Sequence, residues 1–347
     1  MKPRPAVAQL EPYPLLPVTR GDKIRLDLNE STRGCSPAVL EALRAVSRED
    51  VSAYPDYPEL LEKIAGRYGI APEQLVLTNG ADDGIRAVMQ TFVDPGETVV
   101  VADPSFGMIQ LHARVMGARM HPVPYGEDLS FPGEGFLQAA CPAPRLIAIV
   151  RPDSPTGAVI SHRDLTALLE SAPHSLIMLD ETYHHFLGES CLNWIHRYPN
   201  LLVVHSFSKA WGLAGLRLGF IAGAPELLTE IRKVNPPFAV NGLAVRAALA
   251  ALEDEAFLQE VVADVTREKA FLLAELARLG IPARGSGANF VLMQVGEAAP
   301  AIHARLVQQN ILVKNLHGIP LLRGYFRVAV GRREENLAFL RALGELL

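Results

Sequence analysis

Residues 201–222 read LLVVHSFSKAWGLAGLRLGFIA, and this stretch decides the fold. Its first six residues are nearly all apolar, which predicts a strand buried on both faces of a mostly parallel sheet. In such sheets ligands bind beyond the carboxyl ends of the strands, where this stretch places Ser206, Ser208 and Lys209. Three glycines follow, and Arg217 stands eight residues after the lysine. Two hydroxyls, a guanidinium and an amine predict a pocket for a ligand that carries a phosphate and an aldehyde.

Further short apolar runs precede this stretch and alternate with helical patterns. This alternation predicts a large α/β domain with a mostly parallel sheet flanked by helices. The additional strands are expected at 98–103 (TVVVAD), 118–124 (ARMHPVP), 146–150 (LIAIV), 176–180 (LIMLD) and 216–222 (LRLGFIA). The helices are expected at about 36–46, 59–68 and 107–116, with another that follows TNGADDG and ends near Phe92.

The pattern changes after Pro225. It is helical to about Leu279, and three strands follow, with a helix between the first two and another after the last. These strands are NFVLMQV (289–295), ILVK (311–314) and YFRVAVG (325–331). We therefore expect a smaller α+β domain at the C-terminal end. The expected division is an N-terminal segment (1–35) that joins the small domain, a large domain (36–235), and a long helix with the small domain (236–347).

Composition excludes several classes of partner and compartment. The chain has 347 residues, of which 49% are hydrophobic and 20% charged, as in ordinary globular proteins. A net charge of -5 without a run of lysines or arginines gives no basic surface for nucleic acid or an anionic membrane. Three separate cysteines without a CxxC pair suggest no disulfide framework and no metal site, and they fit a reducing compartment. Prolines and a glutamate interrupt the N-terminal residues, so we expect no secretion signal and a cytoplasmic protein.

A carboxylate joins the lysine at the expected strand ends. Asp180 ends the expected strand LIMLD, so it and Lys209 could line one crevice, although an ordinary ion pair is the simpler reading. The segment SFSKAWGLAGLRLGF (206–220) resembles the lysine motif of fold-type I aminotransferases that use pyridoxal phosphate (PLP), especially the histidinol-phosphate aminotransferase branch. Other motifs occur in the order of that family: LNESTRGCSP, AYPDYP, TNGADDGI, DPSFGM, SPTG, DETY, ANF and FRVAVGRREE.

The resemblance implies a seven-stranded-type sheet in the large domain. It also implies three catalytic residues. Lys209 would hold PLP as a Schiff base and then move a proton between the substrate and the cofactor. Asp180 would face the pyridine nitrogen and keep it protonated, although the DET sequence also resembles a helix cap. Tyr183 would donate to the phenolic oxygen of the ring. Without the resemblance it would be an ordinary core tyrosine.

The cofactor phosphate is expected at the start of the helix after TNG. Main-chain groups of Ala81 and Asp82 would bind its oxygens together with Ser206, Ser208 and Arg217. A carboxylate repels phosphate, so we expect the Asp82 side chain to cap the helix instead.

Two aromatic residues complete the cofactor site that the resemblance implies. Phe106 matches the residue that stacks on the pyridine ring, and Tyr54 matches the tyrosine that reaches the phosphate in the neighbouring subunit. The second match implies a homodimer with shared sites. Alone, these would be a core phenylalanine and a loop aromatic.

Substrate residues are expected on the small domain and the N-terminal segment. Arg327 matches the arginine that grips the substrate's carboxylate, and an arginine inside an apolar strand needs an anion. Lys314 stands where the family has an arginine for the substrate's phosphate, but a lysine lacks the bidentate fork. Asn29 lies in the segment that closes over the substrate in relatives.

The chain departs from the family before PTG. Ser154 replaces an asparagine that donates to the phenolic oxygen of the cofactor, and its shorter hydroxyl would reach that oxygen only through a water or a backbone shift. Arg151 and Asp153 replace two further asparagines, which leaves open whether these charges face the substrate.

The favoured function is transamination of a small amino acid or amino phosphate, with glutamate and 2-oxoglutarate as the partner pair. A PLP-dependent decarboxylase of the threonine-phosphate type, or an amino-acid cyclising or oxidising enzyme, remains the alternative, because the same cofactor stabilises a carbanion however it arises. A PLP-sensing regulator would need a DNA-binding domain ahead of Asn29, where none is visible. A nicotinamide dehydrogenase is disfavoured because no GxGxxG follows an early strand.

Overall fold

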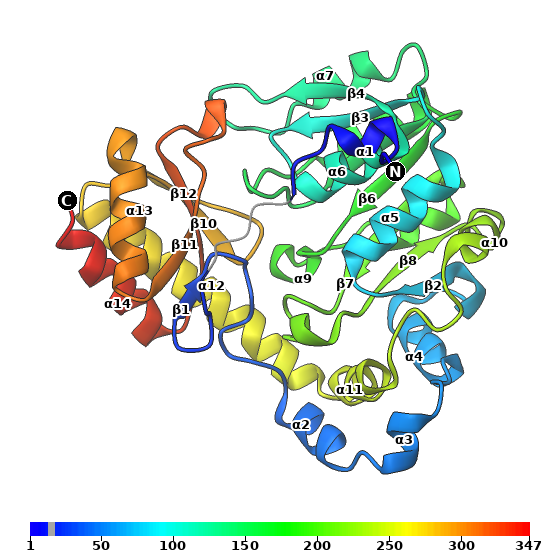
Figure 1. The fold of residues 1–347 in the computed structure, drawn as a ribbon, viewed down its shortest axis with the longest axis horizontal. Helices are drawn as coiled ribbons and strands as arrows, with labels where there is room; N and C mark the ends of the chain where they lie inside the picture. The colour runs from blue at the N-terminus through cyan, green and yellow to red at the C-terminus, as the bar shows by residue number, and fades with distance from the viewer. Residues whose placement is uncertain (13–17) are drawn as a thin grey trace.

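The computed structural model describes residues 1–12 and 18–347, which form two lobes (Figure 1). In these residues the large lobe contains a seven-stranded sheet of order β2-β8-β7-β6-β5-β3-β4. All neighbouring pairs are parallel except those of β8, which runs antiparallel to β2 and β7. The predicted fold class is therefore confirmed. The strands are β2 (Leu75–Thr78), β3 (Thr98–Asp103), β4 (Arg119–Pro124), β5 (Leu146–Val150), β6 (Leu176–Asp180), β7 (Leu201–Ser206) and β8 (Gly219–Gly223).

The apolar runs form central strands because both faces of the sheet are covered. Ile147 and Ile149 of β5 belong to one core cluster, whereas Leu146, Ala148 and Val150 belong to the other. Helices α5, α6 and α10 pack on the second face, and α4, α7, α8 and α11 contribute to the first. The large-lobe helices are α2 (Pro37–Arg44), α3 (Arg48–Ser52), α4 (Pro58–Tyr68), α5 (Ala81–Phe92), α6 (Gly107–Met116), α7 (Gly133–Ala139), α8 (His162–Ser171), α9 (His184–Leu187), α10 (Pro225–Val234) and α11 (Gly242–Glu253).

One strand begins later than predicted. The run that starts at Leu216 becomes β8 only at Gly219, because Ala214–Leu216 form a 3-10 turn and Arg217 has a φ of +55°. A left-handed residue cannot continue an extended strand. This turn points Arg217 back toward the loop that contains the predicted lysine, since its Nη1 donates to Ser208.

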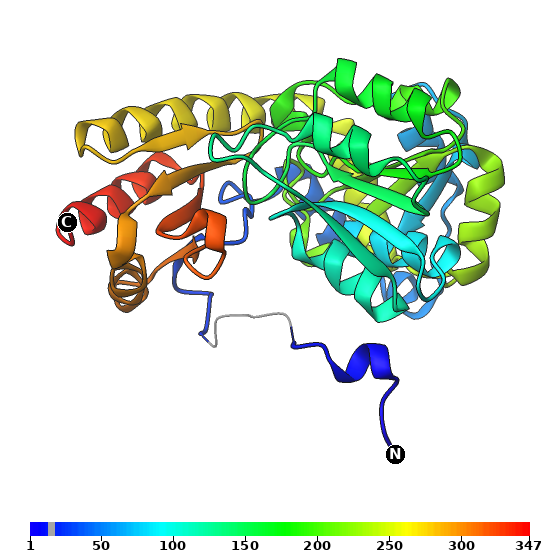
Figure 2. The ribbon, with the colours of Figure 1, turned by 90° about the horizontal axis from the view of Figure 1, so that it is seen from above.

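The small lobe is built on a second sheet of order β1-β11-β12-β10-β9. The three predicted strands are confirmed as β10, β11 and β12, whereas β1 and β9 have three residues each and are too short to show a pattern. Helix α12 runs from the large lobe along the small one (Figures 1 and 2). The elements are β1 (Ile24–Leu26), β9 (Ala283–Gly285), β10 (Phe290–Gln294), β11 (Ile311–Asn315), β12 (Tyr325–Ala329), α12 (Glu255–Arg278), α13 (Ala299–Gln308) and α14 (Arg333–Gly344).

The N-terminal residues connect the two lobes. Helix α1 (Pro5–Ala8) contacts α6 of the large lobe, whereas β1 pairs in parallel with β11 of the small lobe. After β1 the chain crosses back and enters α2. The crossing residues therefore lie between the two lobes, which makes them candidates for the site.

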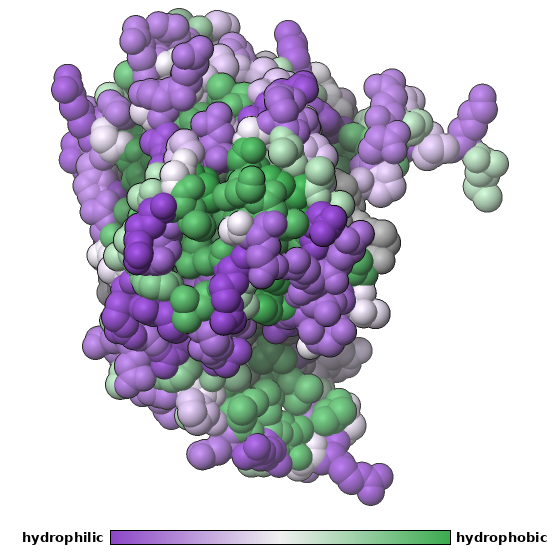
Figure 3. All heavy atoms as spheres, turned by 90° about the vertical axis from the view of Figure 1, so that its left-hand side faces the viewer, coloured by the Kyte–Doolittle hydropathy of each residue, from purple (hydrophilic) through white to green (hydrophobic). Residues whose placement is uncertain are grey.

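The surface is polar with hydrophobic areas. Figure 3 faces the small-lobe end and shows hydrophobic atoms gathered in a central area, with a second group at the bottom, at the level of α2 and α3. Leu40 and Val51 on these helices are exposed. Among the described residues no helix is long and apolar enough to span a membrane.

Candidate active site

The residues predicted at the strand ends come together where β6 and β7 end. Lys209 follows β7, and its Nζ donates a hydrogen bond of 2.8 Å to the carbonyl of Leu28. The ring centroid of Tyr183, which follows β6, lies 5.9 Å from the same nitrogen. Asp180 ends β6 and pairs in register with Val204 of β7. The fold therefore brings an amine, a phenol and a carboxylate to one edge of the sheet.

Asp180 is a buried carboxylate. Only 2% of the residue is exposed, and Oδ1 accepts a hydrogen bond of 2.9 Å from the backbone N–H of Thr182. Burial raises the pKa of Asp180 to about 6; hydrogen bonds from Thr182 oppose this rise, and the carboxylates of Asp82 and Glu181 add to it. A cation bound against this carboxylate would stabilise its ionised form. The position therefore suits a ring nitrogen that carries a proton.

The start of α5 is open for an anion. Gly80 takes the N-cap position with a φ of +86°, and no side chain caps this helix. A Cβ at position 80 would lie 2.5 Å from Nη2 of Arg217, so the close approach of the guanidinium requires glycine. The N–H groups of the first turn, including those of Ala81 and Asp82, point toward the same end of the helix. They can bind the oxygens of a phosphate.

The prediction that Asp82 caps this helix is wrong. Gly80 holds the cap position, and Asp82 lies inside the first turn, where its Oδ2 is 3.4 Å from Nη2 of Arg217. The side chains of Asp82 and Arg217 are 43% and 40% exposed, so this pair contributes only about 0–1 kcal/mol. A phosphate can therefore compete with Asp82 for the guanidinium.

Ser206, Ser208 and Arg217 lie together as predicted. Nη1 of Arg217 donates to Oγ of Ser208 at 3.4 Å and to the carbonyl of Ala214 at 3.3 Å. The backbone N–H of Ser208 donates to Oγ of Ser206 at 3.1 Å. With the open start of α5, these groups form a donor set for a phosphate dianion. The whole arrangement fits a ligand with a phosphate, an aldehyde carbon and a basic ring nitrogen.

Arg327 of β12 connects the small lobe to this edge. Its Nη1 donates to Oγ of Ser154 at 2.7 Å, and its Nη2 donates to the carbonyl of Asp27 at 2.6 Å. The guanidinium carbon lies 5.5 Å from the ring centroid of Phe290. Ser154 is 4% exposed and follows β5 of the large lobe. The hydroxyl that replaces the family asparagine is therefore in contact with the predicted carboxylate-binding arginine.

Lys314 stands beside Arg327. The two residues are partners in the antiparallel register of β11 and β12. Burial lowers the pKa of Lys314, the charge of Arg327 lowers it further, and Asp27 partly opposes this shift. Like charges directly opposite each other destabilise a strand pair. An anion near both residues would offset this repulsion.

Asn29 is part of a segment held by several site residues, and we call residues 27–30 the strap. Asn29 is fully buried, and its Nδ2 donates to the hydroxyl of Tyr183 at 2.9 Å. Its carbonyl accepts from Nδ2 of Asn289 at 3.1 Å. Asn289 lies in the ANF motif, but no role was predicted for it, because its contact depends on a backbone carbonyl 260 positions away.

Two further predicted cofactor residues, Phe106 and Tyr54, lie outside the strap. Phe106 precedes α6 and packs partly buried against the core cluster on that face. Tyr54 is 78% exposed, and its ring stacks on Phe238 at a centroid distance of 4.3 Å. A tyrosine exposed to this degree is available to a neighbouring molecule.

Arg151 and Asp153, the two charged residues before Ser154, point into the large lobe. Arg151 is 1% exposed and forms ion pairs with Glu181 at 3.4 Å and with Glu189. Asp153, also 1% exposed, accepts hydrogen bonds from Thr156 at 3.1 Å and from Ser105. Both side chains therefore bind protein groups of their own lobe.

A histidine cluster lies behind Tyr183 and was not anticipated. The rings of His184 and His205 stack at 3.9 Å, and His205 contacts Glu181 at 3.1 Å. Burial lowers the pKa of His184 to about 3. Burial would raise the pKa of Glu181, but the hydrogen bond and charge of His205 hold it at about 2. This cluster fixes the turn that carries Asp180 and Tyr183.

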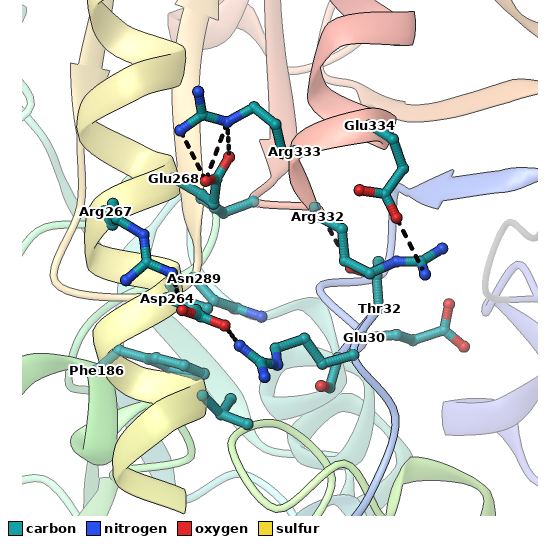
Figure 4. Close-up of a pocket in the computed structure, with 16 residues that line it drawn as sticks. Glu30, Thr32, Phe186, Asp264, Arg267, Glu268, Asn289, Arg332, Arg333 and Glu334 are labelled. Atoms are coloured by element: carbon teal, nitrogen blue, oxygen red, sulfur yellow. Dashed lines mark hydrogen bonds and ion pairs between the residues drawn. The ribbon is translucent and has the colours of Figure 1, made fainter. Parts of the chain in front are cut away.

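A pocket of about 410 Å³ adjoins the strap between α12 and the start of α14 (Figure 4). Asn289, which binds the strap, lines it. The arginines drawn in Figure 4 are paired with carboxylates: Arg33 and Arg267 with Asp264, Arg332 with Glu334 and Arg333 with Glu268. With Glu30, the lining contains four arginines and four carboxylates. Within the described residues, no group of three or more histidines, cysteines or carboxylates could hold a metal ion.

Comparisons with known proteins agree with this geometry. The family model described as aminotransferase class I and II matches residues 21–343. The chain is 35% identical to histidinol-phosphate aminotransferase of Symbiobacterium thermophilum, over 98% of this chain and 97% of that protein. It is 32% identical to the enzyme of the same name from Moorella thermoacetica, over 100% and 93% of the two chains. The crystal structure of histidinol-phosphate aminotransferase from Sinorhizobium meliloti in complex with pyridoxal-5'-phosphate matches with a TM-score of 0.89 and 27% identity, over 99% and 96% of the chains.

Proposed function

Because the chain belongs to the aminotransferase class I and II family and is a PLP-dependent transaminase, we propose that its amino donor is an amino phosphate, with histidinol phosphate as the first candidate. The reaction moves an amino group between an amino acid or amino phosphate and a 2-oxo acid. When bound, PLP supplies an electron sink for the charge that develops at the substrate carbon next to nitrogen. The residues of this chain must then bind, orient and exchange protons.

We assign the proton exchange to Lys209. Its Nζ reaches the carbonyl of Leu28, so the amine lies at the sheet edge beneath the strap. There it would attach the cofactor and, once displaced by substrate, carry a proton to and from the reacting carbon. Asp180 would keep the ring nitrogen protonated, because a cation against a buried carboxylate restores its ionised form. Ser206, Ser208, Arg217 and the first turn of α5 would hold the phosphate.

One observation carries the substrate proposal: Lys314 and Arg327 are register partners on neighbouring strands. Two cations placed opposite each other favour an anion with more than one negative charge. A phosphate monoester is such an anion, whereas an apolar side chain offers nothing to Lys314. This reasoning agrees with the names of the relatives in Symbiobacterium and Moorella.

A half-reaction screen tests this proposal. Purified PLP-loaded enzyme is mixed with histidinol phosphate, glutamate, threonine phosphate and aromatic amino acids, and absorbance is followed to detect conversion of the cofactor to its amine form. Conversion by histidinol phosphate with formation of the keto product supports the proposal. Conversion by aromatic amino acids alone contradicts the substrate assignment. Release of carbon dioxide from threonine phosphate would support the decarboxylase alternative.

We also propose a homodimer with shared sites. The exposed aromatic pair of Tyr54 and Phe238 supports it, together with exposed Leu40 and Val51 on α2 and α3. An exposed apolar area of this kind is typical of an interface. Three free cysteines further support a cytoplasmic location.

Subunit mixing tests the shared site. Lys209→Ala and Tyr54→Ala are each expected to be nearly inactive, because one loses the reactive amine and the other the group donated to its partner. After the two are unfolded and refolded together, a hybrid dimer contains one site with both native residues. Activity should then return to about a quarter of the wild-type value. No recovery in hybrids that form would show that Tyr54 serves its own subunit.

A further inference from the structure

Three successive carbonyls of the strap are bound by residues of the site. The carbonyl of Asp27 accepts from Arg327 at 2.6 Å, that of Leu28 from Lys209 at 2.8 Å, and that of Asn29 from Asn289 at 3.1 Å. The strap is therefore fixed to both lobes at the place where the predicted site residues converge. Its one side chain directed at a reactive group is that of Asn29, which contacts Tyr183.

The backbone conformation of Asn29 and the burial of its side chain are both energetically unfavourable. Its φ is +55°, in the left-handed region that few residues other than glycine and asparagine adopt readily. It is fully buried, and among the described residues its Oδ1 has no hydrogen-bond partner. A buried polar atom without a partner is rare and calls for an explanation. The contact that this arrangement secures is the hydrogen bond from Nδ2 to the Tyr183 hydroxyl, 2.9 Å long.

This hydrogen bond decides what the Tyr183 hydroxyl can do. Its oxygen accepts from Asn29, so its own proton is left to be donated elsewhere in the site. A phenol that accepts a hydrogen bond also becomes a stronger donor, because the two bonds polarise each other. Ser154 is engaged differently, since its Oγ accepts from Arg327 at 2.7 Å.

We propose that Asn29 is a positioning residue for Tyr183: its amide orients the phenol so that the phenol proton points at the ring oxygen of the cofactor. Tyr183 thereby supplies a donor to the ring oxygen that Ser154 does not supply, because the Ser154 hydroxyl is bound to Arg327. The proposal rests on the proposed function, because it needs the cofactor at Lys209. Asn29 acts through Tyr183 and does not itself touch the reacting atoms.

The consequence is a shift in the pH at which the Lys209-linked cofactor changes colour. A donor to the ring oxygen favours its ionised form, so loss of that donor raises the pKa of the chromophore. Asn29→Gly removes the amide and keeps a backbone that tolerates a positive φ. We expect it to raise the chromophore pKa by roughly 0.5 to 1 unit. Asn29→Asp should raise it further, because a carboxylate accepts the phenol proton and withdraws it from the site.

Two controls separate this route from others. Tyr183→Phe should raise the chromophore pKa by itself, and Asn29→Gly should add nothing to it in that background, because a residue that acts through Tyr183 loses its effect with it. Ser154→Ala should leave the colour change in place and raise the KM of an anionic substrate, because it disturbs Arg327.

The outcomes are distinguishable. If borohydride treatment leaves no pyridoxyl group on the Lys209 peptide, the function at this lysine fails before Asn29 is tested. If the coloured enzyme forms in all variants and Asn29→Gly leaves its pKa unchanged, the inference is overturned while the function stands. A shift in Ser154→Ala without one in Asn29→Gly would assign the task to Ser154 instead.

Discussion

The hydroxyl of Ser154, after β5 of the large lobe, accepts a hydrogen bond of 2.7 Å from Nη1 of Arg327 in β12 of the small lobe. The same guanidinium is bound through Nη2 to the carbonyl of Asp27 at 2.6 Å. The predicted substrate arginine is thus oriented from two sides by groups that belong to different segments. Its planar fork keeps a defined direction before any anion arrives, which lowers the entropy cost of binding.

Loss of the Ser154 hydroxyl should weaken substrate binding more than turnover. Ser154→Ala removes one of the two contacts that orient Arg327, and a hydrogen bond to a charged group is worth about 1.5–3 kcal/mol. Because Arg327 keeps the Asp27 carbonyl, we expect the lower end, a rise in KM of about 10-fold with a smaller change in kcat. Steady-state kinetics with the best substrate of the screen measures this. Ser154→Thr retains the hydroxyl and is the matched control; equal KM values in all three proteins would contradict the orienting role.

Removal of the charge at Lys314 should reduce affinity for a phosphate-bearing substrate. Lys314→Met is expected to lower kcat/KM by about 10- to 100-fold, as for the loss of a partly buried charge contact. Lys314→Arg keeps the charge and should retain most of the activity. A substrate that carries only a carboxylate should be affected less by Lys314→Met. If both substrates lose equally, Lys314 does not face the phosphate.

The lowered pKa of Lys314 also gives binding a pH dependence. The free enzyme loses the Lys314 proton at a lower pH than an ordinary lysine, because burial and Arg327 disfavour its charge. An anionic substrate favours the charged form, so affinity should fall as pH rises through the pKa of the free enzyme. In Lys314→Arg this fall should be absent, since a guanidinium stays protonated. A plot of KM against pH for the two proteins is the measurement, and parallel curves would assign the alkaline loss to another group.

Glycine at position 80 should be needed for cofactor affinity rather than for the turn alone. Gly80 and Gly96 share a φ of +86°, but a Cβ would contact Arg217 at 2.5 Å in the first and has nothing within 4 Å in the second. Both alanine variants should therefore lose about 1 kcal/mol or more of stability through backbone strain. Gly80→Ala should in addition weaken PLP binding by at least about 10-fold, because it displaces the guanidinium expected at the phosphate. Fluorescence titration of the two apoenzyme variants with PLP separates this loss of affinity from the effect of backbone strain. Equal PLP affinities in Gly80→Ala and Gly96→Ala would contradict a role of Arg217 in binding the phosphate.

The parts of this protein that sequence reasoning predicted are those with local causes. Lys209 and Asp180 follow apolar runs that form β7 and β6, and strand ends in a parallel sheet share an edge. Asp82 was misassigned because the choice of helix cap depends on Gly80, whose positive φ allows the approach of Arg217. A rule that chooses the helix cap by residue type alone takes no account of Arg217, which is 135 positions from Asp82.

The contacts of the strap could not be predicted from the sequence, because they join residues that are far apart along the chain. The hydrogen bond between Asn29 and Tyr183 joins residues 154 positions apart, and its geometry depends on how β1 pairs with β11. β1 has only three residues, so no alternation of apolar and polar residues identifies it. The direction of Arg151 likewise follows from Glu181 and Glu189, which become its neighbours only once the sheet has formed.

Asp153 should make stability decrease with rising pH. Burial raises its pKa in the folded protein from 3.8 to about 7, hydrogen bonds from Ser105 and Thr156 oppose this shift, and nearby Asp180 adds to it. Between these two pKa values the folded state keeps the proton and the unfolded state releases it, so the unfolding free energy falls as pH rises and levels off above about 7. Asp153→Asn cannot ionise and should escape this fall. Its advantage in unfolding free energy over the wild type should grow between pH 5 and pH 8 by at most about 3 kcal/mol.

Thermal unfolding at a series of pH values measures this difference, with the exposed Asp94→Asn as the control for loss of a surface carboxylate. A constant difference in Tm between wild type and Asp153→Asn across this range would mean that Asp153 ionises alike in both states.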